Sequence, residues 1–149
     1  MSLLFRLEDA GAIGAAIAGV MKPGDCIGLI GDLGAGKTTL ARAILAAMGL
    51  VGEAPSPSFA IVQPYAPPET AIPLLHVDLY RIDDPEEISE LGLDEARIDH
   101  ALLIEWPERM GRSVWPDMLR LVIDFDGEDA RRLTATVPPA WEGRWPFSK

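Results

Sequence analysis

One eight-residue segment constrains this chain more than any other part of its sequence. Residues 31–38 have the sequence GDLGAGKT, which matches the phosphate-binding pattern G-x-x-x-x-G-K-[ST]. The apolar run 26–30 directly precedes it, and residues 36–48 follow with the apolar spacing of a helix, ended by Gly49. A chance match is expected in roughly 0.5% of chains of this length. We therefore predict a buried strand, a phosphate loop and a helix in direct succession.

Each constrained position of this segment has a physical role in holding a nucleotide. Its glycines let the main chain approach phosphate groups, so successive N–H groups form a concave anion site at the positive end of the helix. Lys37 supplies a charge for the β- and γ-phosphates, and Thr38 supplies a hydroxyl oxygen for Mg²⁺. The predicted cofactors are therefore ATP and Mg²⁺. The predicted contacts to the nucleotide are Asp32, Leu33, Gly34, Ala35, Gly36, Lys37, Thr38 and Thr39.

The rest of the chain predicts strands that alternate with helices. Apolar runs bounded by turn residues predict further strands at 3–7, 59–62, 74–80 and 101–105. Helices are predicted at 10–21 and from 85 onward, where Asp84 and Pro85 are typical of a helix start. Proline- and serine-rich stretches predict loops, at 56–58 and 64–68. Residues 119–125 and 131–137 flank a turn at 126–129 and predict an antiparallel hairpin.

This order of elements predicts an α/β fold, specifically a three-layer P-loop NTPase fold. We expect a mainly parallel sheet with an antiparallel edge hairpin and with helices on both faces. A length of 149 residues suits a single domain, 1–149, in which 138–149 form an irregular tail whose Trp141 and Trp145 pack against the body.

Composition narrows the setting in which such a chain would work. It has one cysteine, Cys26, so no intramolecular disulfide can form. No secretion signal or membrane-spanning stretch is recognisable, and we expect a cytoplasmic location with no membrane partner. The formal net charge of −10 argues against direct binding of DNA or tRNA, because binding to a phosphate backbone relies on clustered lysine and arginine.

A phosphate loop usually works with an acid at the end of a neighbouring strand, which holds the metal ion directly or through water. Three apolar runs end in an acid: Asp78, Glu105 and Asp124. Asp124 is the weakest candidate because it enters the predicted hairpin. Periodicity does not distinguish Asp78 from Glu105.

Five short segments, taken in order, resemble one protein family. They are 31–39 (GDLGAGKTT), 56–59 (SPSF), 76–81 (HVDLYR), 90–95 (ELGLDE) and 104–108 (IEWPE). The chain resembles the TsaE (formerly YjeE) ATPases of bacterial tRNA threonylcarbamoyladenosine biosynthesis over roughly residues 3–137. The blocks at 76–81 and 104–108 are specific, since P-loop proteins at large do not share them.

The resemblance implies site roles that the residues alone leave open. Glu105 would be the acid at the magnesium site together with Thr38, and Asp78 would be an active-site acid needed for hydrolysis. Ser58, in a nucleotide-responsive loop at 56–59, completes the implied catalytic set. Trp106 would lie close to the nucleotide, and Arg131 matches a late basic position that approaches it.

Two positions depart from the usual pattern of that family. Ser58 stands where the family usually has threonine, so it keeps a hydroxyl but lacks the β-branch that restricts its rotamers. Ala12 stands where a threonine near the nucleotide is common, and its methyl group cannot make that polar contact.

The resemblance also implies partners, TsaD and TsaB, with tRNA held through them and TsaD modifying the adenosine beside the anticodon. We expect ATP hydrolysis that is slow in the chain alone and stimulated by partners, since no arginine finger is evident in the sequence. One alternative is a small-molecule kinase, although Arg109, Arg112 and Arg120 are scattered and do not form a recognisable lid. The other is a nucleotide-gated binding module without useful turnover.

Overall fold

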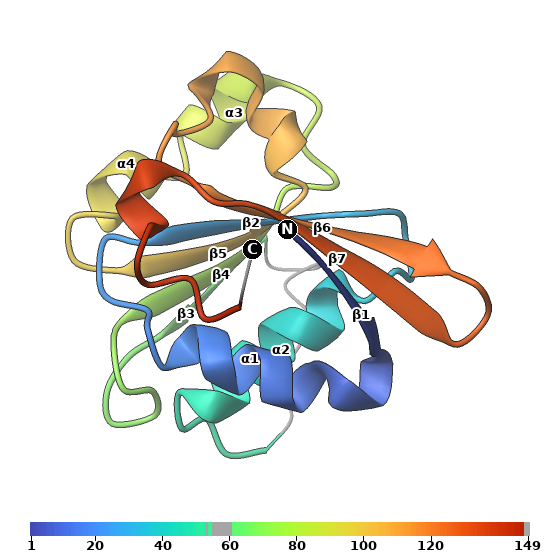
Figure 1. Cartoon of the computed structure of the whole chain (residues 1–149). Coiled ribbons are helices and arrows are strands. Elements are labelled where there is room, and N and C mark those ends of the chain that lie inside the picture. The colour runs from blue at the N-terminus through green and yellow to red at the C-terminus, as the bar shows by residue number, and fades with distance from the viewer. Residues whose placement is uncertain (53, 55–60, 148–149) are drawn as a thin grey trace.

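A single mixed sheet organises the chain (Figure 1). The computed structural model describes residues 1–52, 54 and 61–147, and within them the sheet order is β1-β7-β6-β2-β5-β4-β3. The strands are β1 (Ser2–Arg6), β2 (Cys26–Ile30), β3 (Val62–Tyr65), β4 (Leu74–Asp78), β5 (Ala101–Glu105), β6 (Leu119–Asp126) and β7 (Ala130–Thr136). Strands β6, β2, β5 and β4 are mutually parallel, whereas β7, β1 and β3 form antiparallel pairs toward the two edges. The predicted parallel strands and the antiparallel hairpin toward one edge are confirmed, and β1 adds a further antiparallel strand outside the hairpin.

Helices cover both faces of the sheet, which makes three layers (Figure 1). One face carries α1 (Ala10–Ala18) and α2 (Lys37–Ala47), and the other carries α3 (Pro85–Ser89), α4 (Leu93–Ala96) and the 3-10 helix η2 (Pro107–Ser113). Two shorter 3-10 turns are η1 (Leu7–Asp9) and η3 (Pro139–Trp141). The three-layer α/β fold predicted from the sequence is therefore confirmed. None of the helices in the described ranges is long and apolar enough to cross a membrane.

Side-chain alternation along the strands decides which layer each residue faces. In β5, Leu103 packs in the core under α1 and α2, whereas Leu102 and Ile104 pack in the core under α3 and η2. Successive side chains of a strand point to opposite faces. Glu105, two residues after Leu103, therefore projects toward α2, which carries the last residues of the phosphate-binding motif.

The predicted boundaries of one strand and its neighbouring loop were wrong. We predicted a strand at 59–62 and a loop at 64–68, whereas β3 runs from Val62 to Tyr65 and includes Pro64. Proline cannot donate a ladder hydrogen bond, so a proline-rich segment suggests a loop. β3 pairs with β4 alone and forms an edge of the sheet, where proline is tolerated. Residues 59 and 60 of the predicted strand lie outside the described part of the chain.

Two other predicted elements were too long at their C-terminal ends. The first helix was predicted to end at residue 21, but it ends at Ala18, and Gly19 is its C-cap. The predicted strand 74–80 ends at Asp78, because its Oδ1 accepts a hydrogen bond from the Tyr80 N–H at 2.9 Å and turns the chain.

The tail after β7 packs against the body as predicted. Trp141 is 1% exposed, and Trp145 packs against the same core. Arg144 anchors this segment to the start of β2, where its Nη1 and Nη2 each donate to the Asp25 carboxylate at 2.9 Å. Its Nη1 also donates to the Val20 carbonyl at 2.9 Å. Asp25 is only 7% exposed, and its carboxylate also accepts the Lys22 backbone N–H at 2.8 Å, so the Arg144 guanidinium supplies the positive charge in direct contact with it.

We expect Arg144→Ala to lower the free energy of unfolding by about 2–3 kcal/mol, somewhat less than for a fully buried pair because Arg144 is partly exposed. The cause is the unpaired, buried Asp25 carboxylate that the substitution leaves. The matched control is Arg132→Ala, since Arg132 pairs with Asp126 at 3.0 Å with both side chains exposed by more than 40%. That change should cost less than about 1 kcal/mol. Equal urea midpoints for the two variants would contradict a stabilising role for the Arg144–Asp25 ion pair.

Candidate nucleotide-binding site

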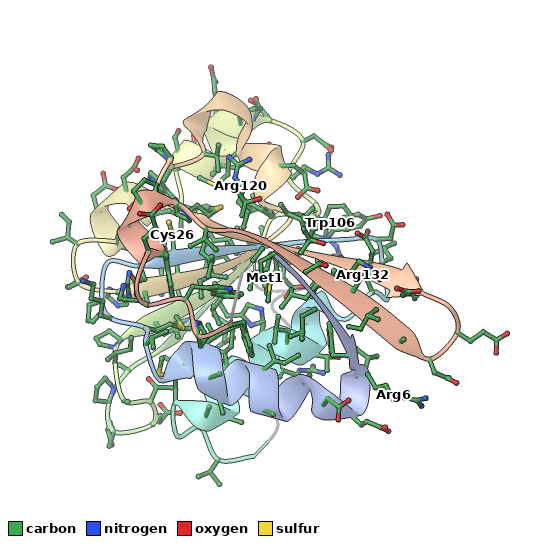
Figure 2. All side chains as sticks on the ribbon, viewed as in Figure 1. Met1, Arg6, Cys26, Trp106, Arg120 and Arg132 are labelled. Atoms are coloured by element: carbon green, nitrogen blue, oxygen red, sulfur yellow. The ribbon has the colours of Figure 1, made fainter. Side chains whose placement is uncertain are left out.

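The phosphate-binding motif lies where the parallel strands end. Residues 31–36 connect β2 to α2, and the carboxyl ends of β2, β5 and β4 meet at the same edge of the sheet. Figure 2 shows Cys26, at the start of β2, and Trp106, just after β5, at opposite ends of the sheet. A cavity of about 200 Å³ opens at this edge. Its lining residues are Leu33, Gly34, Gly36, Lys37, Thr38, Thr39, Asp78, Tyr80, Glu105 and Trp106.

Glycine is required in this loop for both space and backbone angle. A Cβ atom at Gly31 would lie 2.5 Å from the Ile123 carbonyl oxygen, so the loop could not leave β2 alongside β6 with any larger residue. Gly36 has φ +117° and a Cβ there would lie 2.6 Å from Leu7 Cδ2. Glycine at these two positions therefore lets the loop pack closely against Ile123 and Leu7 and lets α2 begin directly after the loop.

Lys37 is held inside the loop that surrounds it. Its Nζ donates to the carbonyl oxygens of Gly31 at 2.5 Å and Asp32 at 2.9 Å, and it lies 4.4 Å from the centroid of the Trp106 ring. Burial lowers the pKa of Lys37, while Glu105 and other nearby carboxylates act in the opposite direction. A partly desolvated ammonium of this kind gains more from a bound phosphate than a solvated one would.

The structure distinguishes the three candidate acids. Glu105 is 2% exposed and its Oε1 accepts a hydrogen bond from the Thr38 hydroxyl at 2.7 Å. Asp78 is its direct neighbour, paired with Glu105 across β4 and β5, and lines the same cavity. Asp124 is exposed and follows Ile123, which faces the core under α1 and α2, so it points to the other face of the sheet. Asp124 is therefore excluded as a partner of the loop.

The donor set at Thr38 and Glu105 suits a magnesium ion. Both groups are hard oxygen ligands, and the Thr38 hydroxyl, by donating its proton to Glu105, leaves its oxygen lone pairs available. Within the described ranges no three His, Cys, Asp or Glu side chains cluster as a metal site. A bound ion would therefore complete its shell with phosphate oxygens and water, as Mg²⁺ commonly does.

Trp106, the first residue after β5, has an unusual backbone conformation and lines the cavity. Its φ of +63° lies in the left-handed region, which non-glycine residues adopt rarely and mostly where the surrounding structure imposes it. Its N–H donates to the Leu29 carbonyl at 3.2 Å, and its ring contacts that of Tyr80 with centroids 4.9 Å apart. The indole is thereby held between Tyr80 and the Lys37 ammonium, beside the cavity.

Arg131 contacts the loop from β7, which lies on the other side of β2 from β5 and β4. It is 7% exposed in β7, and its Nε donates to the Ala35 carbonyl at 3.0 Å. A second hollow adjoins it, lined by Arg6, Leu7, Glu8, Glu128, Asp129 and Arg131. Ala12, at the position of the missing threonine, is exposed on α1. Ser58, the remaining predicted catalytic residue, lies outside the described residues.

Sequence reasoning did not include His76 or Tyr80 among the site residues. Tyr80 lines the cavity, and His76 is fully buried with its Nε2 2.7 Å from Glu105 Oε2. A signal for His76 was available, because it stands two residues before Asp78 and so shares its face of β4.

Comparison with known proteins identifies the family. The family model described as threonylcarbamoyl adenosine biosynthesis protein TsaE matches residues 5–133. The chain belongs to the TsaE family. Relatives named tRNA threonylcarbamoyladenosine biosynthesis protein TsaE include one from Rickettsia bellii, 42% identical over 136 residues, which are 91% of this chain and 93% of the relative. The TsaE protein from Bacillus subtilis is 37% identical over 131 residues, 87% of this chain and 80% of the relative.

A solved structure agrees with this family assignment. The crystal structure of YdiB from Bacillus subtilis superposes with a TM-score of 0.79 at 31% sequence identity, covering 97% of this chain and 91% of that one. The chain therefore shares its three-layer fold with YdiB, and the TsaE family to which it belongs functions in tRNA threonylcarbamoyladenosine biosynthesis.

Proposed function

We propose that this chain binds ATP with Mg²⁺ at the phosphate loop and hydrolyses it in support of the threonylcarbamoyl modification of tRNA adenosine beside the anticodon. The observation that carries the proposal is the hydrogen bond from Thr38 in α2 to Glu105 at the end of β5, 2.7 Å long. It joins the phosphate-binding motif to a buried acid on a neighbouring parallel strand, the arrangement that a metal-dependent nucleotide site requires.

The residues of the site divide the work of binding and reaction. Main-chain N–H groups of the loop and the start of α2 would hold the phosphates, with Lys37 as the point charge. Thr38 and Glu105 would hold Mg²⁺, which when bound would neutralise charge on the phosphate oxygens. Asp78 lines the same cavity as Lys37 and Glu105, where its carboxylate could orient an attacking water.

The two hollows beside the loop support a direction for the bound nucleotide. β5 and β4 lie on one side of β2, and β6, β7 and β1 lie on the other. The acids and Lys37 line the cavity beside β5, so the terminal phosphate belongs there. The hollow beside Arg131 lies on the β7 side, so we assign it to the nucleoside end. Arg131 would support the loop through Ala35 while facing that end.

The proposed partners are TsaB and TsaD, with tRNA held by them. A chain of net charge −10 repels a polyanion, which favours a role away from the modified base.

The proposed function is tested by measuring phosphate release by the purified chain alone and then with TsaB, TsaD and tRNA. We expect slow release alone and faster release in the complex. A phosphorylated small molecule in place of free phosphate would favour a kinase, and modification without phosphate release would favour a gated binding module.

We expect Glu105→Gln to weaken Mg²⁺-dependent nucleotide binding far more than Asp124→Asn does. The first substitution removes an anionic oxygen from the site and keeps its shape, whereas Asp124 lies on the other face of the sheet. Nucleotide affinity measured by calorimetry at several Mg²⁺ concentrations checks this. Small and equal effects of both substitutions would remove Glu105 from the metal site.

Trp106 should report nucleotide binding optically. Because its ring lies 4.4 Å from the Lys37 ammonium, the arrival of a phosphate at Lys37 changes the charge next to the indole. We expect Mg·ADP to change the tryptophan fluorescence and Trp106→Phe to remove most of that change. The control is Trp115→Phe, since Trp115 donates to Asp94 and does not line the cavity. A signal that survives Trp106→Phe and disappears in Trp115→Phe would contradict the assignment.

A further inference from the structure

The buried side chain of His76 is not explained by nucleotide binding itself. It is fully buried in β4 and does not line the cavity. Among the described residues, its side chain makes one polar contact, from Nε2 to Glu105 Oε2, at 2.7 Å. A histidine buried in a parallel strand loses its hydration, and this loss costs free energy unless hydrogen bonds replace it. The contact with Glu105 is therefore the interaction that explains a histidine at this position.

The surroundings of the two ring nitrogens indicate which tautomer the imidazole adopts. Nδ1 is buried and has no hydrogen-bond partner within the described part of the chain. A proton there would leave a buried donor unsatisfied and would leave two lone pairs, on Nε2 and Oε2, facing each other. The proton therefore belongs on Nε2, and His76 donates it to the Glu105 carboxylate.

Glu105 is thereby held at both oxygens by two different elements. Oε1 accepts from the Thr38 hydroxyl of α2, and Oε2 accepts from His76 of β4. A carboxylate with only the Thr38 contact could rotate about its last side-chain bonds, because that bond fixes one oxygen alone. With both contacts the plane of the carboxylate is set, and Oε1 remains on Thr38.

We propose that His76 is a positioning residue that fixes the Glu105 carboxylate in the orientation required for metal binding. This inference rests on the proposed function, in which Thr38 and Glu105 hold Mg²⁺. Outer hydrogen bonds of this kind orient metal ligands, and their loss typically lowers metal affinity about 10–100-fold. In the described part of the chain the polar contact of His76 is with Glu105 and His76 does not line the cavity, so it acts through Glu105.

The test compares two amides at position 76 that differ by one methylene group. His76→Gln can place its side-chain N–H close to where His76 Nε2 lies, whereas His76→Asn carries the same amide on a shorter chain that does not reach Glu105. Binding of ADP is measured by calorimetry with Mg²⁺ and in EDTA, together with the melting temperature. The quantity compared is the gain in affinity due to Mg²⁺.

We expect His76→Asn to reduce the Mg²⁺-dependent gain about 10–100-fold while the affinity in EDTA stays within a few-fold of wild type. His76→Gln should restore most of the gain. If His76→Asn does not fold, His76→Leu removes the donor while keeping apolar packing and must show the same loss. Leu74→Ala, on the same face of β4, is the control for a buried change that does not touch Glu105.

Three results would overturn the inference. They are a wild-type Mg²⁺ gain in His76→Asn, equal losses in His76→Asn and His76→Gln, or a loss in Leu74→Ala as large as in His76→Asn. A wild-type chain that binds ADP with no Mg²⁺ gain would instead refute the proposed metal site itself, and the inference with it. The wild-type titration alone distinguishes that failure from the others.

Discussion

Replacing Lys37 by methionine should weaken ATP binding by at least about 100-fold and abolish measurable hydrolysis, because hydrogen bonds to charged groups contribute about 1.5–3 kcal/mol each. Methionine keeps the length of the buried stem and removes only the ammonium. The ammonium is 4.4 Å from the Trp106 ring and faces the cavity that Thr38 and Glu105 line. No other lysine or arginine lines that cavity within the described residues.

The fold should survive this change. Lys37 Nζ donates to the carbonyls of Gly31 and Asp32, so its removal costs the loop two hydrogen bonds, a cost that the sequence did not indicate. However, burial lowers the pKa of Lys37, which means that the folded chain disfavours the ammonium relative to the unfolded chain. Removing the charge relieves that cost below the unfolded pKa, hence at neutral pH.

The measurements are calorimetric affinity for ATP, phosphate release and the urea midpoint. Lys22→Met is the control, since Lys22 is an exposed lysine at the opposite end of β2. Wild-type affinity and turnover in Lys37→Met would refute the phosphate-loop assignment.

Replacing Asp78 by alanine should preserve ATP binding and lower turnover by about 10²–10⁴-fold, the typical contribution of a positioned acid–base group. Asp78 ends β4 beside Glu105 and lines the cavity, but it belongs to neither the loop nor α2. Binding energy from residues 34–38 should therefore remain. The tRNA modification should be lost with the turnover in a reconstituted system.

Asp78 also has a structural role that the experiment must separate. Its Oδ1 accepts the N–H of Tyr80 at 2.9 Å, and alanine cannot replace that acceptor. Asp78→Asn keeps the acceptor and removes the charge, so it should lose turnover while retaining the turn. Normal modification without turnover in either variant would replace the ATPase by a gated binding module. Normal turnover in both would make Asp78 structural only.

The parts of the fold that local sequence specifies were predicted well. β5 was predicted with its observed bounds, and the strand, loop and helix at 26–48 were predicted within a residue or two, because glycine and lysine positions in that motif tolerate few alternatives. β3 was mispredicted because its proline is tolerated only through its place at the sheet edge, and strand order is not a local property. The same reason explains why the sequence could not rank β4, β5 and β6 by distance from β2.

The sequence named most of the residues that line the candidate site, but it missed Tyr80 and His76 and did not predict the contacts. The resemblance to TsaE selected Glu105 over Asp78 for the metal, and the structure now supplies a geometric reason in the Thr38 hydrogen bond. The contact of His76 with Glu105 depends on two rotamers and on the register of β4 against β5, neither of which periodicity determines. The predicted role of Ser58 stays a prediction, since that residue lies outside the described part of the chain.

A crystal structure of the chain grown with ADP and Mn²⁺ would test directly whether the phosphate loop holds the nucleotide and whether Thr38 and Glu105 hold the metal ion. An anomalous difference map at the manganese absorption edge would locate the ion. Mn²⁺ replaces Mg²⁺ at oxygen sites and is located by its own scattering. We predict one peak about 2 Å from Thr38 Oγ1 and next to Glu105, with the diphosphate along the loop and the nucleoside beside Arg131. A peak elsewhere, or a nucleotide bound away from residues 31–38, would contradict the account.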